Sequence, residues 1–432
     1  MQRLVQDPPT LEQLRSRILR YRNPEDLRPI VQAARRARVV LLGEASHGTS
    51  EFYTTRAELT KRLIAESDIR FIAVEGDWPS CFELNKYVKD LEDNEANSAR
   101  EAMEAFNRWP SWMWANREVE EFAEWLRAYN LQRSPRERIG FYGLDLYSLW
   151  ESMQQIIGYL QRTGSPLLEQ ALHAFACFEP YGEDSQSYGI SAGLLGESCE
   201  EEVIRLLQEM RTSEKGSGGH QNHRGGEAEL SAELNALVAA DAEHYYRTMV
   251  RGGPESWNVR DRHMVRALKQ LLDFHGSDAQ AVIWEHNTHI GDARATDMAE
   301  DGMVNVGQLV REQYLKHDTF SVGFGTHHGE VLAGSTWGAP VEVMTVPPAM
   351  KGSWEDLLAQ AGEGENLLLL FTEENSREAI PELVGHRAIG VVYDPRHERG
   401  NYVPSDIAAR YDAFIYLHET HALHPLPLES LV

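Results

Sequence analysis

The sequence has few cysteines, a shortage of basic residues and no long apolar run. Its three cysteines, Cys81, Cys177 and Cys199, form no C-x-x-C pair, which argues against a disulfide framework and a four-thiolate zinc site. We therefore expect a reducing compartment. The sequence has 42 Lys and Arg residues and 67 Asp and Glu residues, which gives a net charge of −25. This charge disfavours nucleic acid and anionic membranes as partners. Neither a signal peptide nor a membrane span is apparent, so we expect a cytoplasmic protein.

Eight short runs of β-branched and other apolar residues stand out along the 432-residue chain, separated by stretches with helical patterning. Because these runs are apolar throughout rather than alternating, we expect strands covered by helices on both faces. The sequence therefore predicts an α/β fold with a mostly parallel central sheet flanked by helices. The predicted strands are 39–43, 71–74, 139–144, 281–284, 320–324, 367–371, 389–393 and 413–417.

The chain divides into three parts by its pattern. We expect residues 1–146 to form the first part of the α/β core, with an aromatic-rich helical excursion at 90–130, and 276–432 to form the second part. Between them, 147–275 has few strand signals and is expected to be a helical insertion near the carboxyl ends of the strands. Within it, 213–226 (SEKGSGGHQNHRGG) is expected to be a mobile surface loop, in which His220 and His223 are solvated rather than metal ligands.

Ionisable residues follow most of the predicted strands. In an open parallel sheet, ligands bind beyond the carboxyl ends of the strands, where loops from separate strands meet. We therefore expect these side chains to converge on one cleft, although polar residues also follow strands simply because strands end at the surface. They are Glu44, His47, Glu75, Asp77, Asp145, His286, His289, His327, His328, Asp394, His418 and Glu419.

Two acidic segments carry the first candidates. In LLGEASHGTSEFY, 41–53, a strand breaks at Gly43 and turns toward a helix, so that Glu44 can lie beside His47. Such a carboxylate fixes the ring tautomer and raises its basicity, as a general base requires; the alternative is helix capping by Glu44 and simple packing of His47. In FIAVEGDWPSC, 71–81, Glu75 can orient His47, act as a second acid or base, bind metal, or be structural.

Histidine and arginine segments add further candidates. In AVIWEHNTHIGDAR, 281–294, the spacing of His286 and His289 suits metal ligation, oxyanion stabilisation or proton transfer. In SWNVRDRHM, 256–264, Arg260 can bind a carbonyl or carboxylate oxygen, or pair with acids at the surface. The cluster RWPSWMW, 108–114, either walls an apolar pocket or belongs to the core. No G-x-S-x-G, H-E-x-x-H or Walker A pattern accompanies them.

Together and in this order, LLGEASHGTSEFY, AVEGDWP, RWPSWMW, FYGLDLYSLW, SWNVRDRHM, WEHNTHIGDARAT and VGQLVRE resemble the erythromycin esterase family, over nearly the whole chain from Leu11 to Pro427. The resemblance implies a fold akin to the ChaN-like and TIKI-like hydrolases, and hydrolysis of the macrolactone ester of macrolides in members that confer resistance. It makes His47 the match to the family's proposed general base. Its other active-site positions match Glu44, Glu75, Arg260, His286 and His289. The segment GTHHGEV, 325–331, departs from the family pattern through His327 and His328.

We therefore expect a carboxylic ester hydrolase that requires no cofactor. In it His47, oriented by Glu44 or Glu75, removes a proton from the attacking water, while Arg260 and His286 or His289 stabilise the oxyanion. One alternative is a divalent-metal hydrolase of peptide, amide or other bonds, with the metal held by Glu44, His47, Glu75, His286 and His289. Another is a protein that only binds a small ligand. The expected partner is a small neutral or cationic ester, with no nucleic acid or membrane involved, and the oligomeric state stays open.

Overall fold

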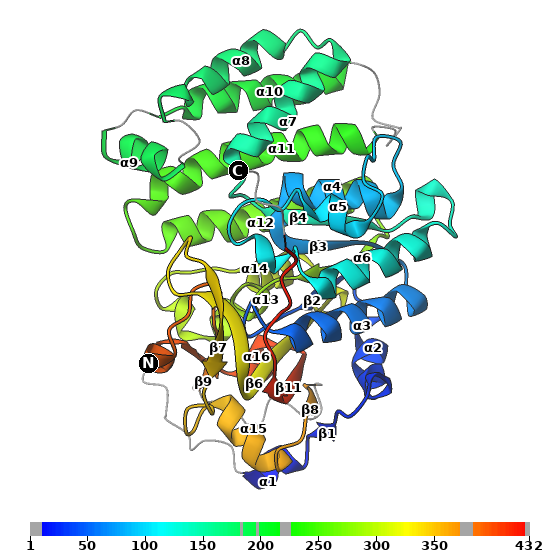
Figure 1. Cartoon of the computed structure of the whole chain (residues 1–432), viewed down its shortest axis with the longest axis vertical. Helices are drawn as coiled ribbons and strands as arrows, with labels where there is room; N and C mark the ends of the chain where they lie inside the picture. The colour runs from blue at the N-terminus through cyan, green and yellow to red at the C-terminus, as the bar shows by residue number, and fades with distance from the viewer. Residues whose placement is uncertain (1–10, 182–184, 196–197, 217–225, 372–382, 428–432) are drawn as a thin grey trace. The chain divides into compact units, whose positions relative to one another are not determined.

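The computed structural model describes residues 11–181, 185–195, 198–216, 226–371 and 383–427 (Figure 1). The described residues fall into two compact units. The first lies within Met1–Ala73, Lys86–Gly140 and Asp278–Val432, and the second within Val74–Asn85 and Phe141–Ser277. The domain boundaries that we placed at residues 146 and 275 from the sequence stay a prediction.

A large sheet forms the framework of the fold. Within the described residues nine strands join it, in the order β1-β8-β11-β6-β2-β5-β3-β4 with β7 paired to β6. The strand β6 is parallel to β2 and β11, and β2 is parallel to β5, whereas β8 and β7 are antiparallel to their neighbours. This confirms the predicted α/β fold with a mostly parallel central sheet. The strands are β1 Leu19–Arg20, β2 Val39–Leu42, β3 Ile69–Asp77, β4 Gly140–Asp145, β5 Gln280–Trp284, β6 Thr319–Gly334, β7 Val341–Val346, β8 Leu367–Leu370 and β11 Ala413–Thr420.

The sheet strands of the first unit are apolar because helices cover them. All four residues of β2 are buried, and α3 buries Phe52, Leu59 and Leu63 along one face. Burial of this much apolar surface is the main favourable free-energy term of such a layered core. The helices that belong wholly or partly to this unit are α1 Leu11–Arg15, α2 Arg28–Ala34, α3 Ser50–Glu66, α4 Trp78–Lys89, α5 Ala99–Met103, α6 Arg117–Asn130, α13 Asn287–Ile290, α14 Val306–Gln313, α15 Trp354–Gly362 and α16 Ile407–Arg410.

Two strand predictions need correction. The strand predicted at 320–324 is β6, which continues to Gly334 because its second half pairs with β7. The strand predicted at 389–393 is wrong, because Ile389 and Val392 make only isolated bridges, with Ser46 and Gly334. The chain forms β9 Val384–Arg387 just before it, paired antiparallel with β10 Tyr402–Ser405.

The second unit is built mainly from helices that pack around their own core. This core includes Leu146, Ile156, Leu206, Ala239 and many further apolar side chains. The helices are α7 Leu149–Thr163, α8 Leu168–Ala176, α9 Ser185–Leu195, α10 Glu200–Gly216, α11 Glu227–Met249 and α12 Glu255–His275. Residues 213–216 of the predicted loop belong to α10, so this part of the loop prediction is wrong. The remaining part of the predicted loop at 217–225, with His220 and His223, lies outside the described residues.

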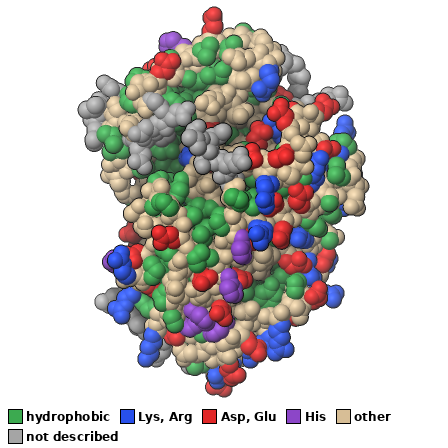
Figure 2. Space-filling model, viewed as in Figure 1, with side chains coloured by type: hydrophobic (Ala, Val, Ile, Leu, Met, Phe, Trp, Pro, Cys, Tyr) green, Lys and Arg blue, Asp and Glu red, His purple; other side chains and the backbone are tan. Residues whose placement is uncertain are grey.

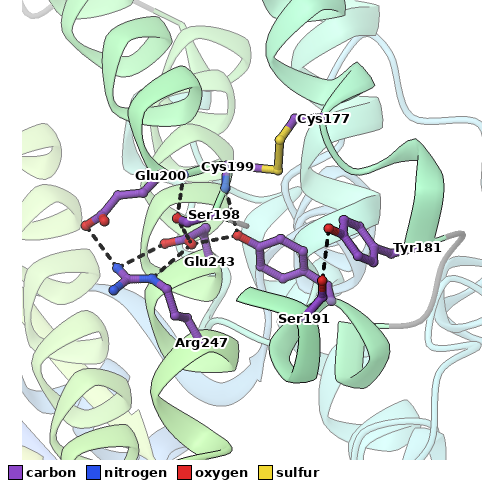
Figure 3. The surroundings of a disulfide bond; sticks show 9 residues. Cys177, Tyr181, Ser191, Ser198, Cys199, Glu200, Glu243 and Arg247 are labelled. Atoms are coloured by element: carbon purple, nitrogen blue, oxygen red, sulfur yellow. Dashed lines mark hydrogen bonds and ion pairs between the residues drawn. A yellow bond between two sulfur atoms is a disulfide. The ribbon is translucent and has the colours of Figure 1, made fainter. Parts of the chain in front are cut away.

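A disulfide joins Cys177 and Cys199 in this unit (Figure 3). The expectation that the cysteines form no disulfide was therefore wrong, and with it the argument for a reducing compartment. The two cysteines are 22 residues apart, but α8 and α10 pack against each other and bring their Cα atoms to 5.9 Å, within the range that a disulfide spans. The remaining cysteine, Cys81, is buried and free.

One face of the molecule mixes charges of both signs. On the face drawn in Figure 2, acidic and basic side chains lie interspersed, with apolar side chains between them. None of the helices in the described ranges combines the length and the apolar character that crossing a membrane demands. The cytoplasmic location stays a prediction.

Candidate active site

The loop after β2 and the helix α3 bring a buried carboxylate, an imidazole and a guanidinium into one group. His47 Nδ1 lies 2.8 Å from Glu44 Oε1, and Arg56 Nη2 donates to Glu44 Oε2 at 2.7 Å. The exposed fractions are 1% for Glu44, 7% for His47 and 0% for Arg56. A carboxylate that accepts from Nδ1 selects the neutral tautomer in which Nε2 is the basic nitrogen. The expected contact between Glu44 and His47 is thus present.

Two glycines let this loop fold tightly between β2 and α3. A Cβ atom on Gly48 would lie 1.9 Å from the carbonyl oxygen of Leu332, and the Gly48 oxygen accepts from the N–H groups of Leu332 and Leu423 at 2.9 Å. A Cβ atom on Gly43 would lie 2.2 Å from Asn287 Oδ1. The Leu332 backbone and the Asn287 side chain therefore approach the loop as closely as only glycine permits.

His286 lies beside His47. The two ring centroids are 4.8 Å apart. His286 is the N-cap of α13, and its Nδ1 accepts from the backbone N–H of Thr288 at 3.3 Å and lies 2.8 Å from the Thr288 hydroxyl, which can donate to it as well. With Nδ1 as the acceptor, the neutral ring carries its proton on Nε2. His289 is also buried, with 2% exposed, and lies within the short α13 helix.

Glu75 and Arg260 belong to a second group, in the second unit. Arg260 Nη2 donates to Glu75 Oε1 at 2.7 Å and to Asp145 Oδ2 at 2.6 Å, while its Nε donates to Asp145 Oδ1 at 2.9 Å. The Arg260 guanidinium also lies over the Tyr147 ring, 4.9 Å from its centroid. The alternative that Arg260 pairs with acids at the surface is wrong, because its ion pairs with Glu75 and Asp145 are buried.

The electrostatics of this second group follow from burial and pairing. Burial alone would raise the pKa of Asp145, but the charge and hydrogen bonds of Arg260 outweigh it and lower that pKa below its usual value. Burial likewise opposes the charge of Arg260, yet Asp145, Tyr147 and Glu75 raise its pKa well above the usual value. Asp145 and Arg260 are therefore ionised at neutral pH.

The predicted residues thus form two groups, one per unit. Glu44, His47 and His286 lie together in the first, and Glu75 and Arg260 in the second. The prediction that all of them, with His289, surround one substrate stays a prediction. Asp394 takes no part in either group, since it pairs with Arg396 and His397 at the surface.

The two unusual histidines of β6 form a separate group with His418 of β11. The ring centroids of His327, His328 and His418 lie 5.1 to 5.4 Å apart in pairs. Burial, followed by the neighbouring imidazoles, lowers the pKa of His327 and of His418. Among the residues placed by the structure, however, no three His, Cys, Asp or Glu side chains are grouped so that they could hold a metal ion. The divalent-metal alternative stays a prediction.

Sequence reasoning missed Arg56, Asp145 and Tyr147 as parts of these groups. Arg56 is a basic residue on the apolar face of α3, in step with Phe52 and Leu59, and a charge in such a stripe signals a buried partner. Asp145 was recognised as a strand-end acid but given no role. Of the aromatic cluster at 108–114, Trp112 and Trp114 are buried, each with 4% exposed, and belong to the core.

Comparison with known proteins gives the chain a family. The family model described as erythromycin esterase matches residues 64–420. The matched region begins after the segment that holds Glu44 and His47. A curated relative, erythromycin esterase type II of Escherichia coli, is 20% identical over 402 residues, covering 84% of this chain and 87% of the relative.

Solved structures show the same fold. A succinoglycan biosynthesis protein has a TM-score of 0.76 at 20% identity, with 96% of this chain and 98% of that chain covered. A protein from Bacillus cereus has a TM-score of 0.78 at 16% identity and the same coverage. A mutant of the erythromycin esterase EreC in its open conformation has a TM-score of 0.67 at 16% identity, with 98% of each chain covered. By the family match across most of its length, the chain belongs to the erythromycin esterase family of ester-hydrolysing enzymes.

Proposed function

We propose that this enzyme cleaves a carboxylic ester with water activated by His47, without a covalent acyl-enzyme. The contact of 2.8 Å between His47 Nδ1 and Glu44 Oε1 carries the proposal. It commits the proton of the neutral ring to Nδ1, so that Nε2 is the nitrogen able to accept a proton from water. A base positioned in this way contributes typically about 10² to 10⁴ in rate.

The reaction begins when Nε2 of His47 takes a proton as the water oxygen bonds to the ester carbonyl carbon. The tetrahedral intermediate then breaks its bond to the alcohol oxygen, which takes the proton back from the imidazolium. Glu44 stabilises the imidazolium between these two steps, because its carboxylate lies against the Nδ1 proton. Arg56 in turn compensates the buried charge of Glu44 when His47 is neutral.

His286 has the complementary tautomer. Since its Nδ1 accepts from Thr288, its Nε2 carries a proton that can be donated to an oxyanion. Two adjacent imidazoles of this kind can supply a base for the attacking water and a donor for the oxyanion. The same role for Arg260 is less well supported, because two carboxylates already engage its guanidinium. The contributions of Arg260, Glu75 and His289 stay predictions.

For the substrate we propose a macrolide macrolactone. The family match and the curated relative named as an erythromycin esterase support this class. The net charge of −25 favours the approach of a macrolide whose amino sugar is protonated, although it steers the ligand rather than recognising it.

The experiment compares His47→Ala with the wild type on p-nitrophenyl butyrate and on erythromycin, followed by absorbance and by the mass gain of one water. We expect the variant to be about 10² slower or worse. His421→Ala is the matched control, since His421 Nδ1 makes a similar contact of 2.7 Å with Glu51 but is exposed. An unchanged rate in His47→Ala would reject the mechanism. Binding of erythromycin without turnover by either protein would favour a ligand-binding protein.

A further inference from the structure

A buried chain of polar side chains adjoins the two loops that carry Glu44 and His286. It starts at Glu355 of α15, passes through His386 of β9 and ends at Asn287 of α13. His386 Nδ1 lies 2.6 Å from Glu355 Oε1, and His386 Nε2 lies 3.2 Å from Asn287 Nδ2. Each of the three residues is 0% exposed. Polar groups buried this deeply destabilise a fold unless they are hydrogen-bonded. We therefore ask what these three side chains contribute in this position.

The donors and acceptors of this chain can be assigned from its geometry. The Asn287 amide pairs with the backbone of Phe324: Nδ2 donates to the Phe324 oxygen at 2.7 Å, and Oδ1 accepts from the Phe324 N–H at 3.2 Å. Because Nδ2 only donates, His386 Nε2 must be the acceptor, and the proton of the ring is on Nδ1 facing Glu355. Glu355 Oε1 also accepts from the N–H of Arg387 at 2.9 Å.

The ionisation of the pair agrees with this assignment. Burial lowers the pKa of His386 in spite of the nearby carboxylate, so the ring is neutral. Burial alone would raise the pKa of Glu355, but the hydrogen bond from His386 and the charge of Arg387 outweigh it and lower that pKa, so the carboxylate is ionised. A neutral imidazole therefore donates to a carboxylate on one side and accepts an amide N–H on the other.

Asn287 connects this chain to the residues of the candidate active site. Its backbone N–H donates to the carbonyl oxygen of Glu44 at 2.9 Å, and its own carbonyl oxygen accepts from Arg410 Nη2 at 3.0 Å. His286, whose ring lies against His47, is the residue immediately before it. The position of Asn287 thus determines how the loop after β5 meets the loop after β2.

We propose that Glu355 and His386 are positioning residues, which lock the Asn287 amide and thereby hold His286 against the Glu44 and His47 loop. The catalytic consequence rests on the proposed function, whereas the positioning of the loop does not. Neither residue touches the substrate. Loss of the chain should reduce turnover more than substrate binding, because reacting groups must be held to within a fraction of an ångström.

The experiment contrasts Glu355→Leu with Glu355→Gln. Gln keeps an oxygen for His386 and Arg387, and its amide nitrogen replaces Oε2, which has no hydrogen-bond partner among the described residues. We expect Glu355→Leu to lower kcat at least tenfold with KM changed less than threefold, and Glu355→Gln to keep kcat within threefold. Asn130→Ala is the stability control, because the buried Asn130 amide pins the backbone of Ile139 in the same way as Asn287 pins Phe324.

Amide hydrogen exchange gives a readout that needs no substrate. The N–H of Asn287 should exchange at least tenfold faster in Glu355→Leu than in the wild type, and at the wild-type rate in Asn130→Ala. Unchanged exchange in Glu355→Leu overturns the proposal whether or not any ester is cleaved. Faster exchange in a protein that cleaves no ester supports the positioning role and rejects the proposed function.

A measurement on the wild type decides the matter if Glu355→Leu does not fold. Nitrogen-15 NMR of the histidine rings should show His386 neutral with its proton on Nδ1 at pH 7. Finding the proton on Nε2 overturns the proposal, because two donors would then face each other between His386 and Asn287.

Discussion

At the scale of single residues, the carboxylate of Glu44 contacts both His47 and Arg56, so the ion pair with Arg56 supports the contact with His47. The pair is almost wholly buried, and Nε and Nη1 of Arg56 have no hydrogen-bond partner among the described residues. The Arg56 guanidinium instead lies 4.3 Å from the Tyr53 ring centroid and 5.1 Å from that of Trp284. A buried ion pair costs desolvation on both sides, so removing one partner leaves the other charge uncompensated.

Replacement of Arg56 by Met should therefore lower the free energy of unfolding by about 3–5 kcal/mol. The double variant Glu44→Gln with Arg56→Met should recover part of this loss, because no charge then remains buried, while staying inactive. Urea unfolding of the two single variants and the double variant measures the coupling. A single variant no less stable than the double one would contradict this account of the pair.

The residues that could be predicted from the sequence are those whose partners are local. Glu44 and His47 are three positions apart in one turn, and a strand end marks both of them. Asn287 lies within a recognised motif, but its role depends on Phe324 and His386, which are remote in sequence. No periodic pattern in the sequence indicates such contacts, because they form only when the strands assemble into the sheet.

At the scale of elements, the connection between β2 and α3 depends on how closely β6 approaches it. The Gly48 carbonyl accepts two backbone hydrogen bonds, and the place of its missing side chain is taken by the Leu332 backbone. The loop therefore has little freedom to move away. Its conformation places Glu44 and His47 between β2 and α3.

Gly48→Ala should lower the free energy of unfolding by about 1–3 kcal/mol, because backbone must shift to admit the methyl group. It should also slow ester hydrolysis, since the shift occurs one residue from His47. Gly390→Ala is the control, because a Cβ atom there would meet nothing within 4 Å. Thermal unfolding and kcat of both variants test this, and equal behaviour of the two would show that the close approach of β6 is unimportant.

The elements themselves were predictable to the extent that their pattern is intrinsic. Runs buried on both faces, such as β2 and β5, are visible in the sequence. The extension of β6 and the failure of 389–393 as a strand were not, because pairing partners rather than composition decide them. The disulfide between Cys177 and Cys199 could not be predicted for the same reason, since only the packing of α8 on α10 brings the two thiols together.

At the scale of the whole molecule, both units bury ionised groups whose pKa values are lower than usual. Against the opposing effect of burial, pairing lowers the pKa of Asp145 in the second unit and of Glu355 in the first. Burial lowers the pKa of His386. A group with a lowered folded-state pKa stabilises the fold above its ordinary pKa, and that stability is lost as the pH falls.

Stability should accordingly be highest near neutral pH and fall on acidification. The loss should begin below about pH 6.5 through His386 and steepen near pH 4 through the two carboxylates. Thermal unfolding of the wild type between pH 7 and pH 4 measures this, and Glu355→Gln should show a smaller decrease than the wild type. A midpoint that rises on acidification would contradict the assigned ionisation states.

The length of β6 restricts how the sequences of this family can be aligned. Its sixteen residues pair in turn with β2, β11 and β7, so one missing or additional residue would break three sets of matched partners and exchange the two faces of the sheet. Gaps should therefore be placed before Thr319 or after Gly334 when this chain is aligned with relatives of about 20% identity. The strand β6 thus provides an ungapped reference from which the more variable segments on either side can be aligned.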